Sequence, residues 1–148
     1  MDHRLKKFII SFPKGWVNVS EENPDGPPTF INELIRPSGV LQISTAAYLS
    51  GELPDADNNT LLGLSRKAGI THDFGKHNHE ESGNCRFGKY GFVQFGRPDF
   101  PYIAVWHLTN GKDFIFSTFI CSESPRIEQV NDVHQILTTL RRKNIFGL

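Results

Sequence analysis

The order of apolar and polar positions along the chain predicts strands, one helix, more strands and a final helix. Short runs rich in β-branched and aromatic side chains, separated by glycine and proline, are typical of strands. Eight such runs lie at residues 7–12, 16–19, 29–36, 40–48, 84–87, 90–96, 102–109 and 113–121. We therefore expect an α+β fold with an antiparallel β-sheet of about six or more strands.

A helix is predicted from about Asn58 to Ala68, where the apolar residues recur with a helical period. Asp57 or Asn58 can cap its first turn, and Gly69 stands where a glycine often follows the last turn. The segment is glycine-containing and weakly apolar, so we expect it to depend on packing against the sheet.

A second helix is predicted at the end of the chain. Ser124 can cap it, and Pro125 can occupy the first helical position, where a missing N–H costs nothing. Its apolar stripe consists of Ile127, Val130, Val133, Leu137 and Leu140, and Arg141, Arg142 and Lys143 are expected in its last turn. With two helices flanking the sheet, residues 1–148 are expected to form a single α/β/α-type sandwich domain.

Asn110-Gly111 predicts a two-residue hairpin turn, because both central positions of a type I′ turn need a positive φ. That turn would pair Thr109 with Lys112 and His107 with Phe114. Both faces of this hairpin carry large apolar side chains, whereas a sheet with one wet face alternates apolar and polar residues. The hairpin should therefore be central and covered on both sides, by helices or by a partner.

One hairpin face combines Tyr102, Trp106, Ile115 and Phe119. Tryptophan and tyrosine are favoured where proteins bind one another, so these four residues are candidate partner-binding residues. The alternative is that a helix of the same domain covers this face, and the sequence leaves both possibilities open.

Charge and composition narrow the classes of ligand. Lysine plus arginine equals aspartate plus glutamate, 16 against 16, so the net charge is zero. Proteins that neutralise nucleic-acid phosphates carry a basic excess, and we expect neither a nucleic acid nor an anionic membrane as partner. No apolar run approaches the roughly 20 residues of a membrane span. Cys85 and Cys121 form no paired motif, and a cytoplasmic location is expected.

Acidic residues gather in two loops, with Glu21, Glu22 and Asp25 in the first and Glu52, Asp55 and Asp57 in the second. Such residues usually form a solvated surface. They could also form an acidic rim that steers a basic partner, which makes Glu21, Glu22 and Asp25 further candidates for partner binding.

A histidine-rich segment holds His72, His77 and His79, with Cys85 beyond. A metal needs several such ligands converging, and this spacing matches no standard site. We expect a solvated loop without a metal. Binding of a metal or small ligand by the His72–Cys85 loop remains the alternative.

Catalytic machinery is not evident. A nucleophile needs a base in reach, and Cys121 has only His107 or His134 to serve it. In the predicted hairpin Cys121 and His107 lie on opposite faces. No glycine-rich phosphate loop is present, so we expect no cofactor and favour a non-enzymatic role.

The chain resembles the PsbP-like fold group, which includes the Ran-binding Mog proteins, the DcrB lipoprotein family and DcrB-like chaperones of type VI secretion effectors. The resemblance rests on Phe12-Pro13-Lys14-Gly15-Trp16, on the strand run from Trp106 to Phe119, and on the closing amphipathic helix. It implies an antiparallel sheet flanked by helices and a binding role without catalysis, and it assigns no functional residue. Because no lipobox or export signal is found, we expect neither a lipoprotein nor a thylakoid-lumen role.

The leading hypothesis is a bacterial-type protein-binding module, such as an immunity or chaperone-like partner of a secreted toxin or effector. The alternative is a metal- or small-ligand-binding protein or enzyme that uses the His72–Cys85 loop. The sequence does not identify the partner, and a homodimer remains open.

Overall fold

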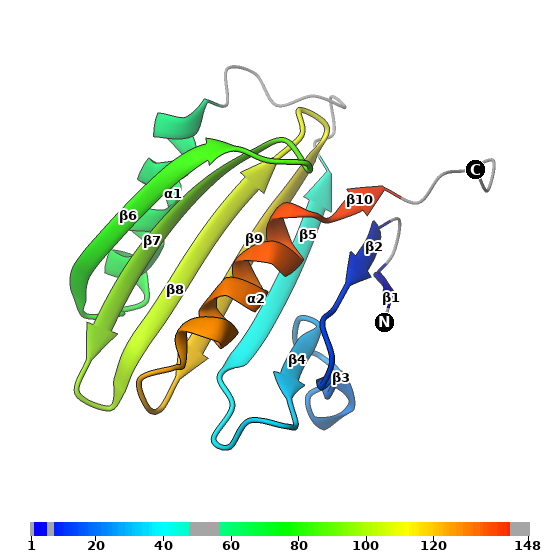
Figure 1. Cartoon of the computed structure of the whole chain (residues 1–148). Helices are drawn as coiled ribbons and strands as arrows, with labels where there is room; N and C mark the ends of the chain where they lie inside the picture. The colour runs from blue at the N-terminus through cyan, green and yellow to red at the C-terminus, as the bar shows by residue number, and fades with distance from the viewer. Residues whose placement is uncertain (1, 6–7, 48–56, 143–148) are drawn as a thin grey trace.

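The computed structural model describes residues 2–5, 8–47 and 57–142, and in these ranges the chain forms two antiparallel sheets and two helices (Figure 1). The large sheet has seven strands, in the spatial order β3 (Trp16–Asn18), β4 (Thr29–Asn32), β5 (Val40–Ala47), β9 (Asp113–Cys121), β8 (Phe100–Thr109), β7 (Lys89–Arg97) and β6 (Lys76–Asn84). The small sheet has the order β1 (Asp2–Leu5), β2 (Phe8–Ser11) and β10 (Arg141–Arg142). The α+β prediction is confirmed.

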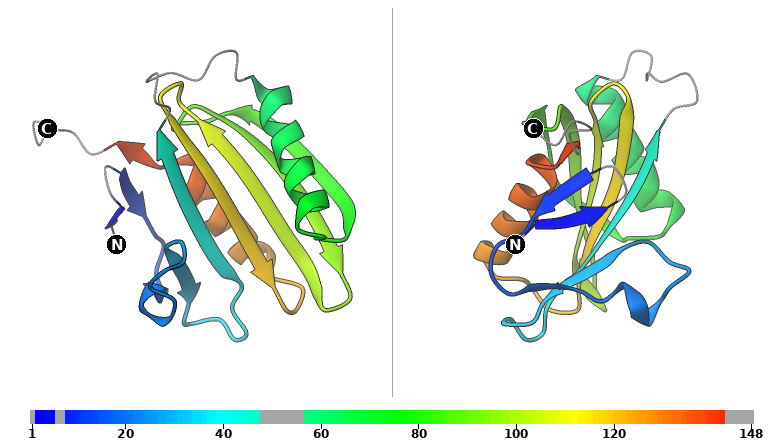
Figure 2. Two further views of the ribbon diagram at one scale, coloured as in Figure 1. Left: turned by 180° about the vertical axis from the view of Figure 1, so that it is seen from behind. Right: turned by 90° about the vertical axis from the view of Figure 1, so that its right-hand side faces the viewer.

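The two helices lie on opposite faces of the large sheet (Figure 2). Helix α1 (Asn58–Thr71) packs over β6, β7 and β8, and α2 (Ile127–Thr138) covers the other face. A short 3-10 turn, η1 (Ser20–Glu22), lies in the loop between β3 and β4. The expected arrangement of a sheet between two helices is thus observed. Among the described residues, no helix is long and apolar enough to cross a membrane.

The larger core lies beneath α2. Its aromatic side chains include Trp16, Phe30 and Phe92, and Val133, Ile136 and Leu137 reach it from the helix. The four hairpin residues proposed for partner binding are part of this core, with exposed fractions of 8%, 1%, 0% and 0% for Tyr102, Trp106, Ile115 and Phe119. Because a helix of the same chain covers them, these residues are not a surface on which a partner can dock.

Helix α1 packs on a smaller core centred on Val93, Phe95 and Val105. Its N-terminal cap is as predicted, since the Asp57 carboxylate accepts the backbone N–H of Thr60 at 2.8 Å. The helix continues to Thr71. Gly69, expected to follow the helix, lies inside it and is buried against Phe95, where an added Cβ would come within 2.1 Å of the ring.

The hairpin turn is longer than predicted. The Asn110 side chain accepts the backbone N–H groups of Lys112 and Asp113, at 3.0 Å and 2.7 Å, and holds them in the turn. Thr109 therefore pairs with Phe114, and the register differs by two residues from the predicted one. A shift of two keeps every side chain on its face. The prediction that both faces are covered holds on the α2 face, whereas on the other face α1 covers β8 and leaves part of β9 exposed. Cys121 and His107 lie on opposite faces of the hairpin, as predicted.

Helix α2 begins at Ile127 and has no side-chain cap, so the predicted role of Ser124 is wrong. Ile127, expected in the apolar stripe, is 67% exposed. The basic pair Arg141–Arg142 lies beyond the helix and forms β10 against β2. Arg142 Nη2 donates to the buried Asp113 carboxylate at 3.0 Å, which fixes β10 to the start of β9.

The histidine-rich segment is an edge strand, β6, and not a loop. It pairs with β7 from Lys76 to Asn84, and most of its side chains are exposed. Of the strand predicted at 84–87, Asn84 is the last residue of β6 and residues 85–87 lie in the turn that leads to β7. An exposed, polar edge strand carries no apolar period, which explains why the sequence did not indicate it.

Candidate functional site

The face of the sheet that carries α1 is only half covered. The helix lies over β6, β7 and β8, so β9 and β5 extend beyond it on this face (Figure 2). A groove of about 230 Å³ lies there, between the end of α1 and the loop that joins β3 to β4. Its lining residues are Pro27, Gln42, Ser44, His72, Phe74, Phe116, Thr118 and Ile120.

The groove floor is formed by neighbouring residues of β9 and β5. Phe116 pairs with Ser44 and Thr118 with Gln42, so these four side chains point to one face. Ile120 pairs with Val40, a residue that is 38% exposed. A partly exposed strip of apolar side chains beside hydroxyl and amide groups results from the alternation of β9, which places large apolar residues on both faces.

One groove wall is a loop fixed by hydrogen bonds. Ser20 Oγ accepts the backbone N–H of Thr29 at 2.8 Å, and Thr29 Oγ1 donates to the Pro27 carbonyl at 2.8 Å. From the floor, Gln42 Nε2 donates to Thr29 Oγ1 at 3.4 Å. The loop and the floor are therefore parts of one hydrogen-bonded unit.

The opposite wall is the turn that ends α1. The rings of His72 and Phe74 stack with their centroids 5.4 Å apart. The backbone N–H of Phe74 donates to the Gly69 carbonyl at 2.9 Å, which folds the turn back toward the helix. His72, expected in a histidine loop, is thus one wall of a groove in which neither His77 nor His79 takes part.

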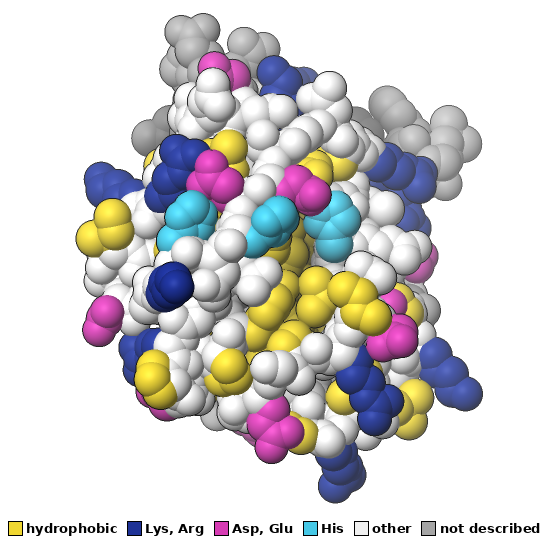
Figure 3. Space-filling view, turned by 60° about the vertical axis from the view of Figure 1, so that its left-hand side comes forward, with side chains coloured by type: hydrophobic (Ala, Val, Ile, Leu, Met, Phe, Trp, Pro, Cys, Tyr) yellow, Lys and Arg dark blue, Asp and Glu magenta, His cyan; other side chains and the backbone are white. Residues whose placement is uncertain are grey.

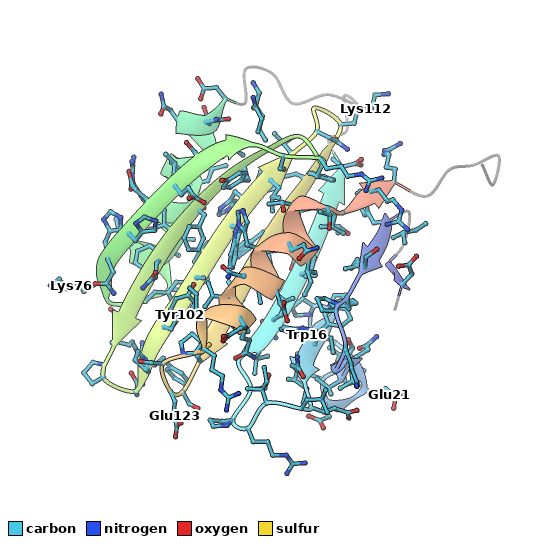
Figure 4. All side chains as sticks on the ribbon, in the orientation of Figure 1. Trp16, Glu21, Lys76, Tyr102, Lys112 and Glu123 are labelled. Carbon is cyan, nitrogen blue, oxygen red and sulfur yellow. The ribbon has the colours of Figure 1, made fainter. Side chains whose placement is uncertain are left out.

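Three carboxylates lie in the loop that contributes Pro27 to the groove. Glu21 and Glu22 are in η1, and Asp25 lies two residues before Pro27. All three side chains are exposed. Figure 4 labels Glu21 at the outer end of this loop. No described residue forms an ion pair with any of the three. Glu52 and Asp55 of the second acidic loop lie outside the described residues.

A second pocket, of about 430 Å³, lies between α1 and β6. Phe95 and Ile70 provide apolar surface, and Arg66, Asp73 and His77 provide polar groups. Arg66 binds Glu80 through two nitrogens, with Nε 2.8 Å from Oε2. This contact is the main reason why the pKa of Glu80 is lowered.

The histidines of β6 do not converge. A bulge between His77 and His79 directs them to opposite faces, where the first contacts Phe95 and the second Phe92. In the described part of the chain, no three histidine, cysteine, aspartate or glutamate side chains come together as metal ligands. Burial raises the pKa of the Cys85 thiol, which keeps it protonated.

On the α2 side, histidine side chains border a strip of hydrophobic surface (Figure 3). His134 of α2 contacts the Tyr90 ring edge-on, with the centroids 5.1 Å apart. Tyr90 donates to Glu81 at 3.0 Å, and burial with this contact raises the pKa of Tyr90 to about 12. The His134 ring therefore packs α2 against Tyr90 of β7.

A buried polar pair that the sequence did not suggest joins α1 to the sheet. Ser65 Oγ lies 2.7 Å from His107 Nδ1, and burial lowers the pKa of His107 to about 4. Ser65 is fully buried, so this pair lacks the access that a nucleophile needs. Cys121 is likewise buried, which raises the pKa of its thiol to about 12.

Comparison with known proteins bears on the fold. No family model matches the chain, and no curated protein matches its sequence. The solution structure of cyanobacterial PsbP (CyanoP) from Synechocystis sp. PCC 6803 matches with a TM-score of 0.61 and 11% identity, over 96% of this chain and 91% of that chain. The chain therefore has a PsbP-like fold.

A crystal structure from Bacteroides thetaiotaomicron VPI-5482 is also similar, with a TM-score of 0.51 and 13% identity. The match covers 95% of this chain and 46% of that one. These matches confirm the resemblance to the PsbP-like fold group that the sequence indicated. At such identities the PsbP-like fold is what the comparisons establish.

Proposed function

We propose that this chain is a non-catalytic protein-binding module that holds a segment of a partner protein in the groove between α1 and the β3–β4 loop. The observation that carries the proposal is the half-covered sheet face. Phe116, Ile120 and Phe74 offer apolar surface there, beside a wall that hydrogen bonds hold in place. Exposed apolar strips with a polar border are typical of protein interaction sites.

The size of the groove favours a protein segment over a small molecule. Sites for drug-sized ligands measure roughly 300–1,000 Å³ and enclose most of the ligand. The groove measures about 230 Å³ and is open along the sheet. It has room for an anchoring side chain, while the neighbouring strand surface can accept the rest of a partner.

The location of the reactive side chains supports a non-catalytic role. Ser65, His107 and Cys121 are all buried, and none of them lines the groove. The groove itself holds hydroxyl, amide and imidazole groups with no carboxylate next to the His72 ring among its lining residues. Binding needs only this surface.

We extend the proposal to an immunity or chaperone-like protein whose partner is a secreted toxin or effector. The support for this finer step is the PsbP-like fold together with the sequence resemblance to a group that includes chaperones of such effectors. Identification of the captured partner tests this step. A partner with no relation to secretion would contradict the immunity or chaperone-like role, and the broader proposal of a protein-binding module would stand.

The test of the groove is a matched pair of arginine substitutions. Ser44 is exposed on the groove floor, and its side chain makes no hydrogen bond to any residue that the structure describes, so Ser44→Arg should fold normally and fill the groove. Ser124→Arg adds the same charge at an exposed site before α2. Each protein is used for affinity capture from lysate of the native organism, with mass spectrometry.

A partner retained by wild type and Ser124→Arg, and reduced at least about tenfold with Ser44→Arg, supports the groove. If both variants retain the partner equally, the partner binds at a site other than the groove. No specific partner on any of the three proteins rejects the function.

A small-ligand function is the second candidate, because the pocket between α1 and β6 has the volume of a ligand site at about 430 Å³. Asp73 and His77, from the segment that the sequence suggested, contribute to its lining. A ligand bound there would contact Ile70, which lies outside the groove. The two candidate sites can therefore be distinguished by which isoleucine responds to binding.

A further inference from the structure

We infer that the pocket between α1 and β6 binds an organic cation, namely an amine that carries an aromatic or branched aliphatic body. This pocket lies apart from the groove, and its occupant does not depend on the partner proposed there. At about 430 Å³ the pocket has the size of a site for a small ligand. Its lining brings together an aromatic ring, a carboxylate and the C-terminal end of a helix.

The apolar part of the site is formed by Phe95 and Ile70. Gly69 of α1 lies against the Phe95 ring, and the ring centroids of Phe74 and His77 are each 6.1 Å from its own. These contacts hold the Phe95 ring in place at the base of the pocket. Ile70 lines the pocket from the helix and is 83% exposed. The apolar body of a ligand would remove surface of both side chains from water, which favours binding.

The two basic side chains of the lining are already bound. Arg66 donates to the Glu80 carboxylate through Nε and Nη2, and His77 Nε2 lies 3.2 Å from Glu80 Oε2. One carboxylate therefore engages both basic groups, through a bidentate contact in the case of Arg66. For an anionic ligand, Glu80 is a competitor for these groups and a like charge beside the site.

The acidic side chain of the lining is Asp73, which follows α1. The neighbouring Arg97 donates through Nη1 to the Asp73 carbonyl at 2.8 Å, and its Nε and Nη2 bind the Asp99 carboxylate. The Asp73 backbone is thus held, while no residue that the structure describes forms an ion pair or a hydrogen bond with its carboxylate. This carboxylate can therefore meet the charged end of a ligand whose body lies against Phe95.

The end of α1 adds to the negative potential of the pocket. A helix carries partial negative charge at its C-terminus, because its last carbonyl groups have no partner within the helix. α1 has 14 residues and no basic side chain in its last turn that would offset this charge. Gly69, Ile70 and Asp73 of the lining lie in or just after that turn. Both the helix end and the Asp73 carboxylate therefore favour a cation over an anion.

Three probes with the same aromatic body and different charges test the inference: phenethylamine, 2-phenylethanol and 3-phenylpropanoate. Each is titrated into the full chain with labelled isoleucine methyl groups, and binding is followed by NMR. Phenethylamine should shift the Ile70 signal and bind at least about fivefold more tightly than either of the other probes. Ile120 in the groove and Ile127 on α2 should not respond.

The variant Asp73→Asn removes the charge and keeps the shape of the side chain. Asp73 has a φ of 52°, and asparagine is among the residues that adopt this left-handed conformation, so the variant should fold. It should bind phenethylamine at least about fivefold more weakly than wild type does. The matched control, Asp132→Asn, removes the same charge from α2 on the other face of the sheet and should bind as wild type does.

Tighter binding of 3-phenylpropanoate would show that Arg66 and His77 select the ligand, and it would overturn the inference. Equal binding of the three probes would show that only apolar contact matters, and it would overturn the inference as well. The same holds if both variants weaken binding equally, or if Ile70 does not respond to any probe at about 10 mM. Since none of these outcomes depends on Ile120, the groove is judged separately by its own test.

Discussion

At the scale of single residues, His107 is the buried titratable group with the clearest consequence. It lies between α1 and the sheet, where Ser65 Oγ approaches its Nδ1 and the rings of Phe114 and Phe116 lie 5.5 Å and 4.9 Å away. Burial disfavours the charged ring and lowers the pKa of His107 to about 4, from 6.5. The neutral ring is therefore a requirement for the packing of α1.

This shift predicts a loss of stability in mild acid. Above pH 6.5 the ring is neutral in both states, whereas between pH 6.5 and 4 the unfolded chain binds a proton that the folded chain does not. The free energy of unfolding should then fall with pH, by about 2 kcal/mol between pH 7 and pH 5. Urea unfolding of wild type and His107→Gln at both pH values measures it. A His107→Gln protein with an unchanged pH dependence would contradict the assignment.

At the scale of elements, the packing of α1 on the sheet depends on glycines that let the helix and the strands approach each other closely. Gly69 of the helix lies against Phe95, and Gly91 of β7 lies against Leu61. Gly63, in the same helix, has no described atom within 4 Å of where a Cβ would stand, apart from its chain neighbours and the backbone of its own helix. The two glycines of α1 therefore differ in their surroundings, since Gly69 is packed against a ring and Gly63 faces open space.

Alanine at these two positions should have opposite effects. Gly63→Ala gains helix propensity without a clash and should stabilise the protein by about 1 kcal/mol. Gly69→Ala must displace the Phe95 ring and should destabilise it by about 1–3 kcal/mol. Thermal or urea unfolding of both variants gives the answer. Similar changes for both would show that α1 does not pack as described.

How far the sequence predicts each element depends on local signals. The Asp57 cap, the central hairpin and the existence of both helices were predictable, because they rest on caps, turns and apolar periods. The end of α1 was not predictable, because Gly69 lies inside the helix to allow contact with Phe95, whereas in the sequence it looks like a glycine that ends a helix. Strand β6 was missed since a polar edge strand has no apolar alternation.

At the scale of the whole molecule, the groove arises from segments far apart in the chain. Pro27, Ser44, His72 and Phe116 meet only because β5 pairs with β9 and α1 leaves that half of the sheet uncovered. The sequence indicated His72 as part of a histidine-rich segment and could not indicate that it lines a groove with Pro27 and Phe116. Conversely, Trp106 suggested an interface and lies in the core, because α2 folds over it.

The central claim, that a partner binds in this groove, is tested most directly by NMR of the chain with labelled isoleucine methyl groups, recorded with and without the captured partner. The groove predicts the largest change at Ile120, whose side chain lies on its floor. Ile70 in the second pocket and Ile127 on α2, which are 83% and 67% exposed, should change little. A dominant change at Ile70 or Ile127, with Ile120 unaffected, would contradict the account.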